Sequence, residues 1–306
     1  MSGLAETPDW IALDWGGTHL RAWAMVGDKP VAHLANDCGT GGLSRDGFGP
    51  ALVALVGDWL KDDRCIPAYA CGMLGSRQGW VEAPYRAVPC APLGGGLVTA
   101  PQSDPRLSVH VVPGLKQARP ADVMRGEETQ IAGFLALNPG WDGVICLPGT
   151  HSKWVHVSAG EVVSFQTFLT GESFALLSEH SVLRHGMSGW DEAGFDAGLA
   201  QGLDRPDRLL ARLFTLRAEG LLEGLDPATA RARLSGLLIG AELAAAKPYW
   251  LGQRVAVLGA GDLAALYARA LDGLSVPVSA HTADAATLAG LAAARAAHVT
   301  EAPCAK

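Results

Sequence analysis

Apolar and polar positions alternate from Ile11 to Met25 around a short polar turn at residues 16–19, which predicts a β-hairpin with glycines at its tip. Further apolar runs of strand length follow at 30–34, 66–71, 107–112, 143–147, 154–157, 162–168, 254–258 and 276–279. Helical spacing of apolar residues occurs at 43–60, 122–137, 172–184, 191–202, 206–218, 227–247, 262–271 and 284–298. The chain therefore has the element composition of an α/β protein.

The order strand, glycine turn, strand occurs twice, first around Asp14 and again after residue 143, which indicates an internal repeat of architecture. Asn138-Pro139-Gly140 ends a predicted helix just before the second copy. With 306 residues the chain is long enough for two domains. We predict a first domain over 1–140 and a second over 141–306, whose last helix is free to pack back on the first domain.

Charge and composition narrow the class of protein. A net charge of −7 argues against a general nucleic-acid binder, because clusters of Lys and Arg are missing. No apolar run reaches the roughly 18 to 20 residues of a membrane helix, and residues 1–10 contain no secretory signal. The six cysteines are scattered without a C-x-x-C pair, which is typical of free thiols in the cytoplasm.

The turn of the first hairpin has the residues of a polyphosphate site. Gly16 and Gly17 let backbone N–H groups approach a ligand closely, and Thr18 adds a hydroxyl donor. Asp14, at the end of the strand, is a candidate to hold Mg²⁺ directly or through water. The alternative is an ordinary hairpin whose acid and glycines only shape the turn.

Two other glycine turns add candidate nucleotide contacts. His151 and also His19 flank glycine turns, where each histidine is either a phosphate contact or structural. Gly259 and Gly261 fit a G-x-G-x-x-A pattern after a strand, but too little chain follows for a Rossmann domain. This pair instead lets an adenosine moiety lie against the backbone.

Acidic and aromatic residues near the middle of the chain supply candidate chemistry. Glu127 and Glu128 open a predicted helix, where they either complement the helix dipole or, Glu128 in particular, serve as a general base. Arg77 and Trp80 lie in a long loop rich in Gly and Pro, and we expect them to bind a carboxylate and to cover a sugar face. The alternative for this pair is a solvated Arg beside a packing Trp.

Taken in order, the three glycine turns resemble the two phosphate motifs and the adenosine motif of the sugar kinase, actin and heat-shock ATPase superfamily. Within it, nearly the whole chain resembles the 2-dehydro-3-deoxygalactonokinase family. The most specific segments are Cys71-Gly-Met-Leu-Gly-Ser-Arg-Gln-Gly-Trp80, Met124-Arg-Gly-Glu-Glu-Thr-Gln130, Leu147-Pro-Gly-Thr-His-Ser-Lys-Trp154 and Leu169-Thr-Gly-Glu-Ser-Phe174.

The resemblance implies two ribonuclease-H-like α/β domains with a cleft between them, and transfer of a phosphoryl group from ATP, with Mg²⁺, to the terminal (6-) hydroxyl of 2-keto-3-deoxygalactonate. It implies phosphate and nucleotide contacts at Gly16, Gly17, Thr18, Gly149, Thr150, His151, Ser152, Lys153, Gly259 and Gly261. Substrate contacts are implied at Ser76, Arg77, Trp80, Arg125, Thr170 and Glu172, with Glu128 and Asp14 in catalysis.

Several alternatives stay open at this point. The Arg125-Gly126-Glu127-Glu128 stretch more resembles the catalytic Glu region of the exopolyphosphatase branch, so the identity of the base is not fixed. A phosphatase or exopolyphosphatase of the same fold, or an actin-like nucleotide switch with a protein partner, would share the three motifs. The sequence also leaves open a homodimer and the galacto or gluco configuration of the sugar acid.

Overall fold

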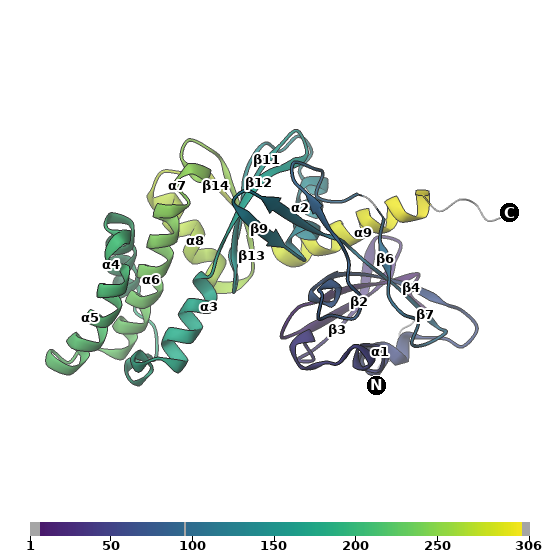
Figure 1. Ribbon diagram of the computed structural model, residues 1–306, viewed down its shortest axis with the longest axis horizontal. Coiled ribbons are helices and arrows are strands. Elements are labelled where there is room, and N and C mark those ends of the chain that lie inside the picture. Colours follow the sequence, from purple (N-terminus) through teal and green to yellow (C-terminus); the bar gives the residue numbers. More distant parts are fainter. Residues whose placement is uncertain (1–6, 95, 302–306) are drawn as a thin grey trace. The chain divides into compact units, whose positions relative to one another are not determined.

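The computed structural model describes residues 7–94 and 96–301, and the chain divides into two compact units (Figure 1). Unit 1 comprises 1–142, 158–164 and 282–306, and unit 2 comprises 143–157 and 165–281. Unit 2 is therefore inserted into unit 1 along the chain. Cys304 lies outside the described residues, and the five described cysteines are free thiols.

The main sheet of unit 1 has six strands in the order β3-β2-β1-β4-β7-β6. These strands are β1 (Trp10–Trp15), β2 (Leu20–Val26), β3 (Lys29–Asn36), β4 (Ile66–Gly72), β6 (Val98–Thr99) and β7 (Leu107–Val111). β1 and β2 pair antiparallel from Trp10↔Met25 to Trp15↔Leu20, so the predicted hairpin is confirmed. β4 lies parallel to both β1 and β7, which places the carboxyl ends of β1 and β4 side by side at the same edge of the sheet.

Helices cover both faces of this sheet because successive side chains of a strand point to opposite sides. Ile11, Leu13 and Trp15 pack with Phe48 and Leu52 of α1 (Phe48–Val56). Trp10 and Ala12 pack instead with Leu291 of α9 (Ala283–Glu301), and α9 also packs against α2 (Glu127–Leu137). The last helix thus belongs to the core of unit 1.

A small sheet in unit 1 corrects the sequence prediction. Its strands, in the order β5-β8-β9, are β5 (Tyr85–Ala87), β8 (Gly114–Ala118) and β9 (Ala121–Met124). The helix predicted over 122–137 is therefore wrong in its first part, because β9 pairs antiparallel with β8 and α2 begins only at Glu127. Gly126 separates the two elements with a φ of 106°, a conformation that a helix does not contain.

The sheet of unit 2 repeats the strand order of unit 1. Its order is β12-β11-β10-β13-β14, and its strands are β10 (Gly143–Leu147), β11 (Ser152–Ser158), β12 (Glu161–Phe168), β13 (Val255–Gly259) and β14 (Val278–Thr282). β10 pairs antiparallel with β11 and parallel with β13, as β1 does with β2 and β4. The repeat indicated by the sequence is a duplicated ribonuclease-H-like sheet.

The helices of unit 2 are α3 (Thr170–Ala175), α4 (Glu192–Asp204), α5 (Leu209–Leu222), α6 (Pro227–Ala245), α7 (Lys247–Trp250) and α8 (Gly261–Gly273). The helix predicted over 172–184 is shorter than expected, since α3 continues as a π-helical turn at 176–180 and a 3₁₀ turn at 182–186. The helix predicted over 43–60 is likewise limited to α1, with 3₁₀ turns on both sides. None of the described helices is long and apolar enough to cross a membrane.

Candidate active site

The turn between β1 and β2 is held from behind by the backbone of residues 39–41. The N–H groups of Thr40 and Gly41 donate to the carbonyls of Gly16 and Gly17 at 3.0 and 3.2 Å. Gly39 packs so closely that a Cβ there would lie 2.1 Å from the Gly17 carbonyl oxygen, whereas a Cβ on Gly17 would meet open space. Among the described residues, the N–H groups of Gly17 and Thr18 have no acceptor. The turn is therefore rigid on one side and open to an anion on the other.

The turn between β10 and β11 has the same construction in unit 2. The N–H of Glu172 donates to the Thr150 carbonyl at 2.9 Å. A Cβ on Gly171 would lie 2.3 Å from the Gly149 carbonyl oxygen, and the outer side of Gly149 is open. Each glycine turn thus receives a second glycine, from the segment after the third strand of its sheet, as a close backbone support.

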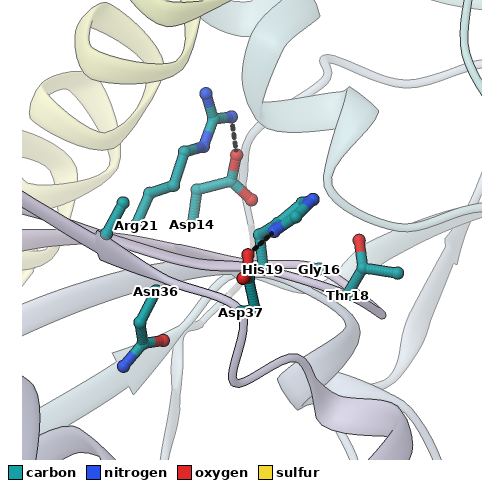
Figure 2. A pocket seen from close by; sticks show the side chains of 8 residues that line it. Asp14, Gly16, Thr18, His19, Arg21, Asn36 and Asp37 are labelled. Carbon is teal, nitrogen blue, oxygen red and sulfur yellow. Dashed lines mark hydrogen bonds and ion pairs between the residues drawn. The ribbon is translucent and has the colours of Figure 1, made fainter.

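Both turns carry the tripeptide Gly-Thr-His, and in both the histidine is paired with a carboxylate. His19 Nδ1 lies 3.0 Å from Asp37 Oδ1, a pair visible in Figure 2, and His151 Nε2 lies 2.6 Å from Glu172 Oε2. Each acid follows the third strand of its sheet. The repeated tripeptide is a sequence signal that could have indicated this arrangement, and the two acid partners were not predicted in this role. The carboxylate of Glu172, which we expected to contact substrate, is paired with His151.

Asp14 lines a cavity of about 460 Å³ in unit 1, with Gly16, Thr18, His19, Arg21, Ala35, Asn36 and Asp37 (Figure 2). One carboxylate oxygen of Asp14 pairs with Arg21, which faces it across the hairpin and also bonds Asp284 Oδ1 of α9 at 2.5 Å. Burial raises the pKa of Asp14, and the charge of Arg21 only partly offsets this. The second oxygen, Oδ1, has no partner among the described residues.

The surroundings of Asp14 fit a magnesium ion that is bound mainly by phosphate and water. In the described parts of the chain, no three His, Cys, Asp or Glu side chains gather into a metal cage. Mg²⁺ in phosphoryl-transfer sites usually has only one or two carboxylate ligands besides phosphates and waters. One free carboxylate oxygen at a cavity with open N–H groups therefore meets this requirement.

Glu127 and Glu128, at the start of α2, differ in environment. Glu128 is 0% exposed, and its carboxylate accepts from the Gly126 N–H at 2.7 Å and the Thr129 hydroxyl at 3.2 Å. Burial, with the charge of Glu127, raises the pKa of Glu128 to about 8. Glu127 is only half-buried, accepts from the Arg125 N–H at 3.0 Å, and is near enough to Asp14 to raise the pKa of Asp14. The geometry favours Glu127 over Glu128 as the group that faces a reactant.

Replacing Glu128 with Gln should flatten the pH dependence of stability. Below about pH 4.5, the ordinary pKa of this side chain, the folded and unfolded proteins both hold its proton, whereas between about 4.5 and 8 only the folded protein does. Stability of the wild type should therefore fall as pH rises through this window, by up to about 1.4 kcal/mol per pH unit. Urea unfolding at pH 5 and pH 8 measures the difference, and equal slopes for both proteins would contradict it.

The loop after β4 departs from its predicted exposure at one position. Trp80 is 5% exposed and stacks on Phe48 with ring centroids 6.0 Å apart, so the expectation of an aromatic surface for a sugar is wrong. Its ring completes the core beneath α1. Arg77 is exposed, its backbone carbonyl accepts from Arg45 Nη2 at 2.9 Å, and among the described residues its guanidinium has no partner. Arg77 is thus available to an anion.

Two other predicted substrate contacts are buried inside unit 1. The guanidinium of Arg125 donates from Nη2 to the Ala83 carbonyl at 2.7 Å and stacks on the ring of Tyr85 at 4.3 Å. Ser76 is also buried, in the 73–80 loop, where a Cβ added at Gly75 would lie 2.8 Å from Arg125 Nη1. Burial argues against direct contact with substrate for Ser76. The buried Nη1 of Arg125 has no hydrogen-bond partner among the described residues, so a substrate contact of Arg125 stays a prediction.

Three predicted ligand contacts in unit 2 belong to a buried network behind the second glycine turn. Glu242 of α6 accepts from Trp154 Nε1 at 2.8 Å and from the Tyr267 hydroxyl at 2.6 Å, and it is also hydrogen-bonded to Thr170 and Ser152. Ser152 is consequently turned inward, whereas Thr170 also lines the cavity beside the turn. Lys153 is buried as well and donates from Nζ to the His151 carbonyl at 3.1 Å. We correct Ser152 and Lys153 from ligand contacts to supports of the turn, whereas the contact of Thr170 with substrate stays a prediction.

Helix α8, which begins in the third glycine turn, lines a cavity of about 770 Å³ in unit 2. The cavity is lined by the Gly149–Thr150 turn, by Trp190 and by residues of α3, α6 and α8. Gly261, the first residue of α8, has a φ of 62° and open space at its Cβ position, whereas Gly259 packs against Ala264. The volume and the apolar lining are those of a small-ligand pocket. Its position beside the second turn suits a nucleoside whose phosphates lie on that turn.

Two sheets that share the order of five strands, each with a glycine turn after its first strand, and a nucleoside-sized pocket beside the second turn define the sugar kinase and actin class of ATPase folds. A sequence model of the 2-keto-3-deoxy-galactonokinase family matches residues 14–294. The chain belongs to this family.

Individual relatives support this assignment. The chain is 36% identical to a protein of Rhizobium meliloti (strain 1021) described as a probable 2-dehydro-3-deoxygalactonokinase, DgoK1, over 93% of this chain and 96% of that one. It is also 36% identical to the 2-dehydro-3-deoxygalactonokinase of Escherichia coli (strain K12), over 93% and 97% of the two chains. A crystal structure from Sinorhizobium meliloti, described as a protein of this kinase type, has a TM-score of 0.85 at 35% identity and covers 97% of this chain and 98% of that one.

Proposed function

We propose that this protein transfers the γ-phosphoryl group of ATP to the terminal (6-) hydroxyl of 2-dehydro-3-deoxygalactonate. The observation that carries the proposal is membership of the 2-keto-3-deoxy-galactonokinase family over residues 14–294. The duplicated Gly-Thr-His turns, each with open N–H groups, supply the phosphate-binding parts that such a reaction needs. A kinase of this type uses ATP as its co-substrate.

Phosphoryl transfer depends on positioning and on charge stabilisation more than on covalent catalysis. The N–H groups of Gly17 and Thr18 in unit 1, and of Gly149 and Thr150 in unit 2, are suited to phosphate oxygens. His19 and His151, held by their carboxylates, are placed to donate further hydrogen bonds. The adenosine moiety would occupy the cavity beside α8. Mg²⁺, bound by Asp14 through its free oxygen, would neutralise charge on the phosphates.

The acceptor alcohol needs a group that takes its proton as the new P–O bond forms. Glu127 is the half-buried acid at the start of α2 and lies within electrostatic reach of Asp14. Glu128 holds its proton up to about pH 8 and is enclosed by its own helix start, which suits a structural group better than a base. We therefore assign proton removal to Glu127.

Arg77→Ala should raise KM for the sugar acid by about 10- to 150-fold and leave KM for ATP nearly unchanged. The exposed guanidinium of Arg77 is proposed to bind the substrate carboxylate, and a charge-assisted hydrogen bond contributes about 1.5 to 3 kcal/mol. Steady-state kinetics with each substrate varied in turn measure both constants. Arg77→Lys should recover part of the loss, and a rise confined to KM for ATP would refute the assignment.

The proposed activity is tested by ADP release across a panel of 2-keto-3-deoxy sugar acids of galacto and gluco configuration, with a parallel assay for free phosphate. The expected result is ADP formed only when a sugar acid is present, with the galacto substrate preferred. Phosphate released without any sugar acid would instead indicate the phosphatase alternative, which the family assignment does not favour. A cytoplasmic location stays a prediction.

A further inference from the structure

Helix α5 of unit 2 is apolar on two faces. Its inner face packs Leu213 and Leu216 against Leu234 and Leu237 of α6. Its outer face leaves large apolar side chains in solvent, with Leu210 at 82%, Phe214 at 64%, Leu221 at 66% and Leu222 at 82% exposure. In Figure 1, α5 lies at the outer edge of the helices of unit 2. Several large apolar side chains exposed along one helix mark an interaction surface.

The spacing of the exposed residues along α5 indicates what kind of partner the helix can pack against. Leu210, Phe214, Arg217 and Leu221 follow one another at intervals of four, three and four residues. Such a seam reads the same in both directions, so a second α5 running antiparallel presents matching positions about a two-fold axis. We propose that the outer face of α5 joins two copies of this chain, with α5 of one copy packed antiparallel on α5 of the other.

The charges on the seam agree with this arrangement. A two-fold axis between Thr215 and Leu216 places Leu210 opposite Leu221 of the second copy, and Phe214 opposite Arg217. Among the described residues Arg217 has no ion-pair partner, so its guanidinium is available to lie on the facing phenyl ring. The pairing occurs twice per dimer, and no charge of the seam faces a like charge.

The size of the contact limits its strength. A helix of 14 residues is about 21 Å long, so two such helices form a small interface beside the roughly 800 Å² per partner of a standard one. The dimer should therefore dissociate in the micromolar range. Sedimentation equilibrium of the full chain between about 1 and 200 µM would detect it. A wild type that stays monomeric throughout would leave this face to another protein and overturn the proposal.

A first variant tests the face itself. Leu210→Glu should weaken the dimer by roughly tenfold or more, because it buries a charge twice in the seam. Leu251→Glu, at a site 61% exposed in the wild type and outside α5, is the matched control and should leave the dissociation constant unchanged. An unchanged dimer in Leu210→Glu, or equal weakening in both variants, would overturn the proposal.

A reciprocal exchange tests the antiparallel register. Phe214→Arg should weaken association by roughly tenfold, because the introduced guanidinium then faces the like charge of Arg217 in the second copy. Adding Arg217→Phe restores an Arg–Phe pair at both sites and should return the dissociation constant to within about threefold of the wild type. Failure of the double variant to recover would exclude this packing. Circular dichroism and the kinase assay, which involves none of these residues, show that each variant is folded.

Discussion

Glu127→Gln should lower kcat by roughly 10²- to 10⁴-fold, while ATP binding survives. A general base contributes about this factor, and Gln keeps the shape of the side chain but cannot accept the proton of the alcohol. The expectation rests on the half-buried position of Glu127 at the start of α2 and on its electrostatic effect on Asp14. The measurements are kcat with saturating substrates and the dissociation constant of a nucleotide.

The neighbouring acid provides a matched control for this experiment. Glu128→Gln changes the same chemical group one residue away, but Glu128 is enclosed and hydrogen-bonded to Gly126 and Thr129. Its kcat should stay within a few-fold of the wild type, with the altered pH dependence of stability described above. If Glu128→Gln loses activity while Glu127→Gln keeps it, in proteins of equal melting temperature, the base is Glu128.

Asp14→Asn should lower kcat by about tenfold to a hundredfold. The substitution removes the charge that we assign to Mg²⁺ while keeping a side chain that fits the same space beside Arg21. The assay is a magnesium titration of kcat with ATP at saturation. Turnover close to that of the wild type at saturating Mg²⁺ would exclude the assignment.

Asp284→Asn separates this effect from simple loss of the arginine contact. Asp284 pairs with the same Arg21 from α9, but it does not line the cavity beside the first turn. Its kcat should therefore stay within a few-fold of the wild type. Equal losses in Asp14→Asn and Asp284→Asn would mean that the orientation of Arg21, rather than a metal ligand, is what the site requires.

The sequence predicted the duplicated sheets because strand alternation and glycine turns are local signals. The same reasoning failed where a property depends on distant contacts. Trp80 follows a glycine in a glycine-rich loop and looks exposed, yet it is buried because it packs with Phe48 of α1. The strand at 121–124 was missed because a run of four residues has no period that separates strand from helix, and its partner β8 gave no signal of its own.

The site residues divide in the same way. The sequence indicated where the glycine turns lie, since each turn is a contiguous stretch after a strand. It did not show which side chains point outward, so Ser152 and Lys153 were assigned to ligands although they are turned into the protein. Glu242 could not be found at all, because its role behind the second turn depends on α6, a helix far along the chain.

The position of α9 constrains how the protein is made on the ribosome. Leu291 and Ala294 of α9 cover Trp10, Ala12 and Tyr69 on the sheet of unit 1, and α9 is synthesised only after all of unit 2. During translation, one apolar face of that sheet therefore stays uncovered until α9 has been made. Unit 2 is synthesised in this interval and can already fold. Unit 1, although it comes first in the chain, is the last part to complete its core, and the apolar face left open in this interval is the kind of surface that is prone to aggregation.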